Sequence, residues 1–305
     1  MDRWLNKILL GNAPDVLMEL PDKSINCCVT SPPYWGLRDY GVEGQLGLEK
    51  TPEEYVQKMV EVFREVRRVL RDDGTCWINL GDTYAAGVLG PGSGKQTTNY
   101  GSCNGSHIEK PRLAPMGLKP KDLVGIPWRV AFALQDDGWY LRQDIIWHKR
   151  NAMPESVKDR PTKAHEYIFL MSKSGRYYYD AESIKEKSVS GDPRRPYAPG
   201  QVDNRGNGHD RGGGSVRVPA GWKTGSGSHG TIHSEGRSRE VVYVDGFTNR
   251  NKRSVWTIPT HPYPGSHFAT FPPDLIKPCI LAGCPENGIT LDPFMGAGTT
   301  GVICA

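Results

Sequence analysis

The sequence has no apolar run near the 18 residues that a membrane-spanning helix needs, and its N-terminus lacks the pattern of a signal peptide. These absences predict a soluble, cytoplasmic protein without a membrane partner. The seven cysteines form no C-x-x-C pair, and the histidines lack the spacing of metal ligands. We therefore expect reduced thiols and no bound metal.

The composition is poor in apolar residues and rich in residues that break regular structure. Apolar residues make up 37% of the 305 residues, beside 36 glycines and 24 prolines. This balance predicts an ordinary core together with one long, loop-rich insertion. The net charge of +4 is small. It permits a nucleic-acid partner without requiring one, so the location of the charge matters more than its sum.

The clearest secondary-structure signal is a helix over residues 51–71. Thr51 suits the N-cap, Glu54 completes a capping box, and apolar residues recur at helical spacing. Strands are predicted on either side, over residues 24–30 and 74–82. This strand–helix–strand order is typical of α/β proteins.

The rest of the chain adds more elements of the same kind and one segment of different character. The other predicted elements are a helix over 127–135, strands over 139–147, 165–171, 254–258 and 289–291, a hairpin strand over 176–179, and a short helix after 271–273. In residues 183–253, Lys and Arg outnumber Asp and Glu, glycine is frequent and apolar periodicity is nearly absent. We therefore expect an α/β domain, formed by residues 1–182 and 254–305, with a flexible, positively biased insertion.

Ser31-Pro32-Pro33-Tyr34 follows the first predicted strand directly. Proline cannot continue a central strand, so the motif lies at a strand's carboxyl end, where open α/β sheets bind ligands. The exocyclic amine of cytosine or adenine is a poor nucleophile because its lone pair is delocalised into the ring. The Ser31 hydroxyl and the Pro32 carbonyl are acceptors suited to its two hydrogens, and Tyr34 offers a flat face to an extruded base. The alternative is a proline turn that only ends a strand.

A second motif, DPFMGAGT over residues 292–299, follows the last predicted strand. Gly296 and Gly298 allow the backbone to approach a ligand closely, and Phe294 can lie against that ligand. The F-x-G-x-G form differs from the dinucleotide fingerprint and is the version that binds S-adenosylmethionine. The alternative is a glycine-rich turn between a strand and a helix.

With both motifs in this order, the chain resembles the DNA amino-methyltransferases that modify N4 of cytosine or N6 of adenine. The resemblance implies a catalytic role for Ser31, Pro32, Pro33 and Tyr34. It implies S-adenosylmethionine as cofactor, bound by Asp292, Phe294, Gly296, Gly298 and Thr299. The segment HFATFP resembles a further cofactor-binding segment and adds Thr270 and Phe271, although its phenylalanines could equally be plain core.

The catalytic motif precedes the cofactor motif, as in the permuted, β-type subclass of that family. The resemblance therefore implies a circularly permuted methyltransferase fold: three layers around a doubly wound, mostly parallel sheet. It also implies that residues 183–253 recognise the target in double-stranded DNA. The arginines expected to contact DNA are Arg194, Arg195, Arg205, Arg211, Arg217, Arg237, Arg239, Arg250 and Arg253. Their alternative role is to keep a disordered loop solvated.

Several questions stay open in the sequence. Family members continue past the cofactor loop to an acidic residue that binds ribose, whereas this sequence stops at Ala305, so we expect a C-terminal truncation. Ser31 favours N4 of cytosine, with N6 of adenine as the alternative. A truncated, non-catalytic DNA-binding remnant and an RNA or protein amino-methyltransferase are further alternatives. A cognate restriction endonuclease acting on the same site is a possible partner, and the oligomeric state is not indicated.

Overall fold

The computed structural model describes the chain except for residues 1–2, 38–40, 42–43, 86–117, 188–248 and 262–269. The chain divides into two compact units, one of residues 1–185 and 251–305 and the other of residues 186–250. Described residues of the second unit form a short antiparallel pair, β5 (Glu186–Lys187) and β6 (Asn249–Arg250). The main sheet and the candidate site belong to the first unit.

A six-stranded sheet in the order β7-β3-β4-β2-β1-β8 forms the centre of the first unit. The strands are β1 (Ile25–Thr30), β2 (Leu70–Leu80), β3 (Tyr140–His148), β4 (His165–Ser172), β7 (Val255–Thr257) and β8 (Thr290–Leu291). Only β4 runs against its neighbours, β2 and β3, while all other neighbouring strands are parallel. The predicted mostly parallel sheet is thus confirmed.

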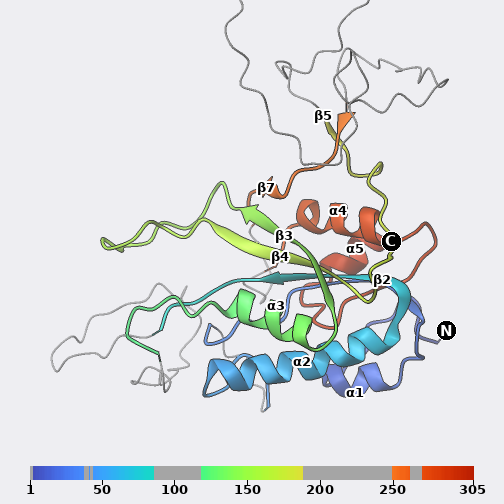
Figure 1. Cartoon of the computed structure of the whole chain (residues 1–305), viewed down its shortest axis with the longest axis horizontal. Helices are drawn as coiled ribbons and strands as arrows, with labels where there is room; N and C mark the ends of the chain where they lie inside the picture. The colour runs from blue at the N-terminus through green and yellow to red at the C-terminus, as the bar shows by residue number, and fades with distance from the viewer. Residues whose placement is uncertain (1–2, 38–40, 42–43, 86–117, 188–248, 262–269) are drawn as a thin grey trace, which may run out of the picture. The chain divides into compact units, whose positions relative to one another are not determined.

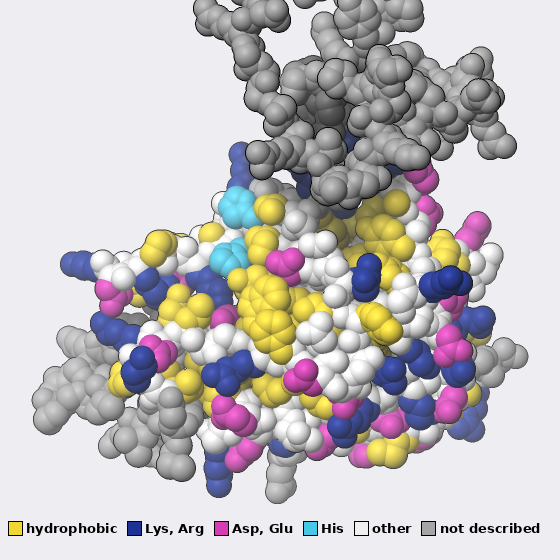
Figure 2. Space-filling view, viewed as in Figure 1, with side chains coloured by type: hydrophobic (Ala, Val, Ile, Leu, Met, Phe, Trp, Pro, Cys, Tyr) yellow, Lys and Arg dark blue, Asp and Glu magenta, His cyan; other side chains and the backbone are white. Residues whose placement is uncertain are grey.

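Helices cover both faces of this sheet, as predicted for a three-layer α/β fold (Figure 1). The helices are α1 (Ala13–Met18), α2 (Pro52–Val69), α3 (Ile126–Asp136), α4 (Pro273–Gly283) and α5 (Thr299–Cys304). Figure 1 shows α1, α2 and α3 on one side of the sheet and α4 and α5 on the other. Basic and acidic side chains are interspersed over the layer of α1, α2 and α3 (Figure 2). Of the helices that the structure describes, none has the length and apolar character of a membrane span.

The capping box predicted for α2 is present. The Thr51 hydroxyl accepts a hydrogen bond from the backbone amide of Glu54, at 3.1 Å, and the Glu54 carboxylate accepts one from the amide of Lys50, also at 3.1 Å. The helix ends at Val69, two residues before its predicted end, because β2 already begins at Leu70. Its apolar stripe is buried against the sheet.

Successive side chains of the central strands enter two different cores. Cys28 and Ile78 pack in the core that includes α2 and α3, whereas Cys27, Val29 and Trp77 pack in the core that includes α4. This follows from the alternation of side chains along a strand. Strands buried on both faces give the near-continuous apolar runs seen in this sequence.

The predicted hairpin strand over residues 176–179 is wrong. Among the described residues, the segment forms no strand; one backbone hydrogen bond joins it to β2, from the amide of Tyr178 to the carbonyl of Asp73, at 2.9 Å. The amide of Asp180 then donates to the carbonyl of Ala282 in α4, also at 2.9 Å. The chain therefore leaves the sheet after β4 and runs to the helix on its other face.

Candidate active site

The two motifs lie side by side because β1 and β8 are parallel neighbours. Thr30 is the last residue of β1, and Asp292 follows the last residue of β8. The Thr30 hydroxyl donates a hydrogen bond to Oδ1 of Asp292, at 2.6 Å, across 262 positions of sequence. Ser31 therefore starts its turn beside the glycine-rich turn, so the predicted catalytic motif and the predicted cofactor motif lie next to each other.

The Asp292 carboxylate stabilises this junction by accepting hydrogen bonds with both of its oxygens. Oδ1 also accepts from the backbone amide of Phe294, at 3.1 Å, and Oδ2 accepts from the Thr300 hydroxyl, at 2.6 Å. Burial raises the pKa of Asp292, and the hydrogen bonds from the two threonines oppose that rise. Asp292 thus fixes the shape of the glycine turn, while its predicted contact with the cofactor stays a prediction.

The proline turn is held in place by α2 and by the segment that precedes this helix. The Tyr55 hydroxyl donates to the carbonyl of Pro33, at 2.8 Å, and the indole of Trp35 donates to the carbonyl of Glu49, at 2.9 Å. In contrast, no described residue donates a hydrogen bond to the carbonyl of Pro32. The Pro32 carbonyl is therefore an acceptor that the described residues leave unpaired.

Tyr34 is tied to the sheet by its hydroxyl. That hydroxyl lies 2.8 Å from Oε2 of Glu166 and 3.1 Å from Oδ1 of Asn79. The Ser31 hydroxyl lies 3.4 Å from the same Asn79 oxygen and 3.5 Å from the Tyr34 oxygen. Burial raises the pKa of Tyr34 strongly, and the negative Glu166 raises it further, so the phenol stays protonated.

Asn79 and Glu166 are site residues that the sequence interpretation missed. The Asn79 amide donates to Glu166, at 3.3 Å, and to the carbonyl of Tyr167, at 3.1 Å. Lys149 forms an ion pair with the other oxygen of Glu166. The available signal was weak: Asn79 is one polar residue in an otherwise apolar part of β2, and buried polar residues need partners.

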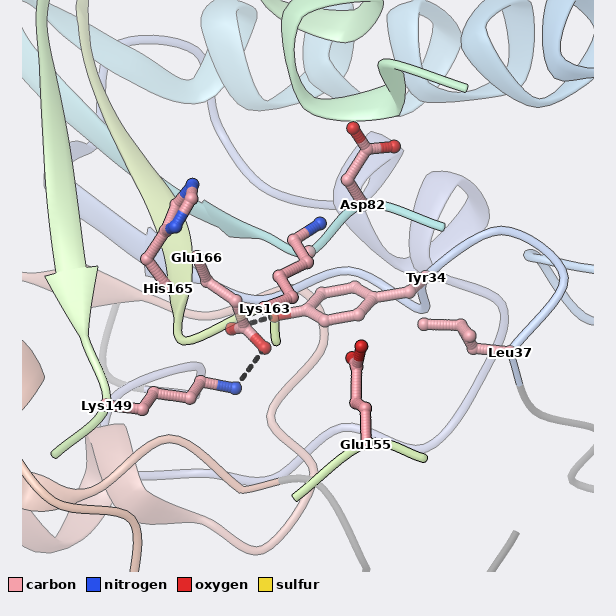
Figure 3. Close-up of a pocket in the computed structure, with 9 residues that line it drawn as sticks. Tyr34, Leu37, Asp82, Lys149, Glu155, Lys163, His165 and Glu166 are labelled. Atoms are coloured by element: carbon pink, nitrogen blue, oxygen red, sulfur yellow. Dashed lines mark hydrogen bonds and ion pairs between the residues drawn. The ribbon is translucent and has the colours of Figure 1, made fainter. Parts of the chain in front are cut away.

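A cavity of about 170 Å³ opens beside Tyr34 (Figure 3). Besides Tyr34, the titratable residues that line it are Asp82, Lys149, Glu155, Lys163, His165 and Glu166. Figure 3 shows the Tyr34 hydroxyl and the Lys149 ammonium both pointing to the Glu166 carboxylate. The cavity is smaller than the roughly 300–1,000 Å³ of pockets for drug-sized ligands, so it suits a single small ring system.

Gly81 sets the position of the Tyr34 ring, since a Cβ at position 81 would lie 2.5 Å and 2.8 Å from two ring carbons. We expect Gly81→Ala to displace this ring and to lower kcat/KM for methyl transfer about 10- to 100-fold, because an active-site displacement near 1 Å costs that much. Steady-state kinetics would measure the loss. Gly175→Ala is the control, since its Cβ would lie 3.7 Å from the nearest atom. Equal activities of the two variants would contradict this role of Gly81.

Asp82 joins the end of β2 to the start of α3. Its Oδ1 accepts from the amides of Gly125 and Ile126, both at 3.0 Å, and from the amide of Thr83, at 2.9 Å. A carboxylate at this place satisfies unpaired amides at the helix N-terminus. It also fixes one wall of the cavity.

We expect Asp82→Ala to lower the free energy of unfolding by about 2 kcal/mol, because it leaves these amides without an acceptor. Urea denaturation would measure the loss. The exposed Asp136, at the other end of α3, provides the control, and Asp136→Ala should change the free energy by less than about 0.5 kcal/mol. If the Asp82 variant were as stable as the control, the capping role would be refuted.

The glycine turn has the backbone that a close ligand approach requires. Gly296 and Gly298 have φ values of 52° and 82°, in the left-handed region that favours glycine. Phe294 is half-buried between this turn and the core. Without side chains at 296 and 298, a ligand can approach the backbone of this turn closely. Phe294, Gly296, Gly298 and Thr299 remain the predicted contacts of S-adenosylmethionine.

Some of the remaining residues predicted to contact the cofactor or DNA belong to the described part of the chain, and others do not. Phe271 is 8% exposed and packs in the core with α4, and Thr270 precedes it half-buried. Arg250 pairs with Glu186 at 2.9 Å, and Arg253 lines a second cavity, of about 890 Å³, together with Arg142. The predicted DNA contacts outside the described residues are Arg194, Arg195, Arg205, Arg211, Arg217, Arg237 and Arg239.

The fold and the site together define a class of protein. A mostly parallel sheet with helices on both faces brings a proline turn and a glycine turn together at the carboxyl ends of neighbouring strands. This is the architecture of an α/β methyltransferase. The chain matches the model of the DNA methylase family N6_N4_Mtase over residues 25–305, and it belongs to that family. It is an S-adenosylmethionine-dependent DNA methyltransferase.

Comparisons with individual proteins agree with this assignment. The chain is 44% identical over 294 residues to the type II methyltransferase M.Cfr9I of Citrobacter freundii, covering 96% of this chain and 78% of that protein. It is 44% identical over 299 residues to M.SmaI of Serratia marcescens, covering 98% and 82%. Among solved structures, the cytosine-N4-specific PvuII DNA methyltransferase has the same fold, with a TM-score of 0.56 at 16% identity, covering 97% of this chain and 76% of that one.

Proposed function

We propose that this methyltransferase modifies N4 of a cytosine that is extruded from double-stranded DNA, within a specific recognition sequence. The observation that carries the proposal is the hydrogen bond from Thr30 to Asp292, which holds Ser31 and Pro32 beside the glycine turn. S-adenosylmethionine, when bound there, supplies the activated methyl group. The residues of the chain would position the amine and accept hydrogen bonds from it. The methyl group would pass to the amine nitrogen, S-adenosylhomocysteine would leave, and the amine would release one proton to solvent.

The chemical problem is the delocalised lone pair of the amine. The Ser31 hydroxyl oxygen and the Pro32 carbonyl would each accept one amine hydrogen, which draws the nitrogen toward tetrahedral geometry and localises its lone pair. The carbonyl of Pro33 is occupied by Tyr55, whereas that of Pro32 has no donor among the described residues. This difference supports Pro32, and not Pro33, as the second acceptor.

Tyr34 would provide the surface on which the extruded base stacks. Its ring is fixed by the close approach of Gly81, and its hydroxyl by Glu166 and Asn79. A platform held at both points loses little freedom when the base binds. Extrusion is required because the reacting amine is out of reach inside a duplex.

The choice of cytosine rests on Ser31. The resemblance drawn from the motifs links serine at this position with N4 of cytosine more often than with N6 of adenine. Residues 183–253 would form the target-recognition region, and their arginines would contact phosphates. Since the 44% identical relatives are named type II methyltransferases, a restriction endonuclease acting on the same sequence is the proposed partner, in the cytoplasm.

The proposal can be tested with the purified chain, unmethylated duplex DNA and S-adenosylmethionine that carries a labelled methyl group. After digestion, nucleoside mass spectrometry should find the label in N4-methylcytosine. Label in N6-methyladenine would overturn the choice of base. Label in RNA or protein instead of DNA would contradict the proposed substrate.

A further inference from the structure

Lys163 stands out among the residues that line the cavity beside Tyr34. Its ammonium nitrogen is buried, and no described residue accepts a hydrogen bond from it. In Figure 3 the side chain extends into the space between Asp82 and Tyr34. A buried ammonium without an acceptor costs free energy, so its retention calls for a partner that binds in the cavity.

The other acidic and lysine side chains of the cavity wall have partners within the chain. Asp82 accepts hydrogen bonds from backbone amides at the start of α3, and Glu155 pairs with an arginine. Lys149 and Glu166 pair with each other. Within the described part of the wall, Lys163 is therefore the lysine whose donors remain for a ligand.

An ammonium group donates hydrogen bonds and accepts none, so the partner must present acceptors. Burial lowers the pKa of Lys163, and the negative charges of Asp82 and Glu166 oppose this change. The cavity also has the size of one ring system and the flat face of Tyr34 at its side. Together these features fit the pairing edge of a nucleobase.

We propose that Lys163 donates hydrogen bonds to N3 and O2 of the extruded cytosine, the two acceptors that follow the N4 amine along its pairing edge. This inference rests on the proposed function and adds a residue that selects the base. Adenine presents one acceptor, N1, beside its amine, and a C–H group follows it. An ammonium placed for two acceptors would therefore favour cytosine, because adenine would leave a donor unsatisfied.

The test combines a change in the protein with a change in the base. Lys163→Met and the wild-type chain would be assayed on duplexes that carry cytosine or 3-deazacytosine at the target position, once sequencing of methylated DNA has identified that position. For the wild type, removal of N3 should lower kcat/KM about 10- to 100-fold, the effect of losing a charge-assisted hydrogen bond. On cytosine, the kcat/KM of Lys163→Met should be lower than that of the wild type by a similar factor. On the analogue, the kcat/KM of this variant should fall little further.

The combination is needed because 3-deazacytosine also changes the basicity of the amine, an effect that both proteins experience equally. Lys158→Met, at an exposed lysine of the preceding segment, should behave as the wild type does. If Lys163→Met kept the wild-type rate, or kept the wild-type sensitivity to the analogue, the inference would be overturned.

Folding provides an independent readout. Since Lys163 has no internal acceptor among the described residues, Lys163→Met should keep or raise Tm, and calorimetry should find unchanged binding of S-adenosylmethionine. A lower Tm would indicate a structural role and would overturn the inference. A wild-type chain that does not methylate cytosine would instead refute the proposed function, so the two failures are distinguishable.

Discussion

Ser31→Ala is expected to lower kcat about 10²- to 10³-fold, the cost of removing one preorganised polar group that acts in the transition state. The Ser31 oxygen is held by its position directly after β1 and lies 3.4 Å from Asn79. Alanine keeps the backbone of the proline turn, including the Pro32 carbonyl, and removes only the hydroxyl. The amine would then keep one acceptor and lose the other.

Single-turnover kinetics would separate this loss from a loss of binding, since the dissociation constant of S-adenosylmethionine should change less than about two-fold. Ser24→Ala is the matched control, because among the described residues the Ser24 hydroxyl bonds only to the carbonyl of Pro21, at an exposed position. If Ser31→Ala had the same kcat as the control variant, the assigned catalytic role of Ser31 would be contradicted.

The second large effect is expected for Asp292→Ala. This change leaves the hydroxyls of Thr30 and Thr300 and the amide of Phe294 without their shared acceptor. The glycine turn would lose the hydrogen bonds that hold it beside Ser31. We expect binding of S-adenosylmethionine to weaken at least about 100-fold and the free energy of unfolding to fall by about 3 kcal/mol.

Asp292→Asn distinguishes this hydrogen-bonding role of Asp292 from a requirement for a negative charge at the cofactor. The amide keeps an acceptor for Thr30, and its NH₂ group can donate to the Thr300 oxygen, so most binding should return. Titration calorimetry measures both variants, and Glu286→Ala provides an exposed control. If Asp292→Asn weakened binding of S-adenosylmethionine as much as Asp292→Ala while the protein stayed folded, the hydrogen-bonding role would be contradicted. Asp292 would then act through its negative charge.

The sequence predicted those features that local patterns encode. The helix around Tyr55 follows from its capping box and apolar spacing, and strands that end just before Ser31 and Asp292 follow from the prolines and glycines. The meeting of the two motifs followed from a rule of parallel sheets, that strand ends at one edge share a site. The helix and the strand ends each follow from a physical constraint that acts within a few residues of sequence, whereas the meeting of the motifs follows from a general rule of sheet topology.

The network behind Tyr34 has no such local signature. Asn79 and Glu166 meet because β2 and β4 pair antiparallel, with Leu80 opposite Tyr167. That register depends on the whole sheet, and 87 positions separate the two residues in the sequence. Lys163 was missed for the same reason, because only the folded structure shows that its ammonium is buried without an acceptor among the described residues.

The most direct test of a shared pocket is a crystal structure of this chain with S-adenosylhomocysteine and a duplex that carries the target site. The ligand is predicted to lie against residues 294–298, with its sulfur toward an extruded base whose amine contacts the Ser31 hydroxyl and the Pro32 carbonyl. A ligand bound elsewhere, or a base whose amine faces away from Ser31, would contradict the account.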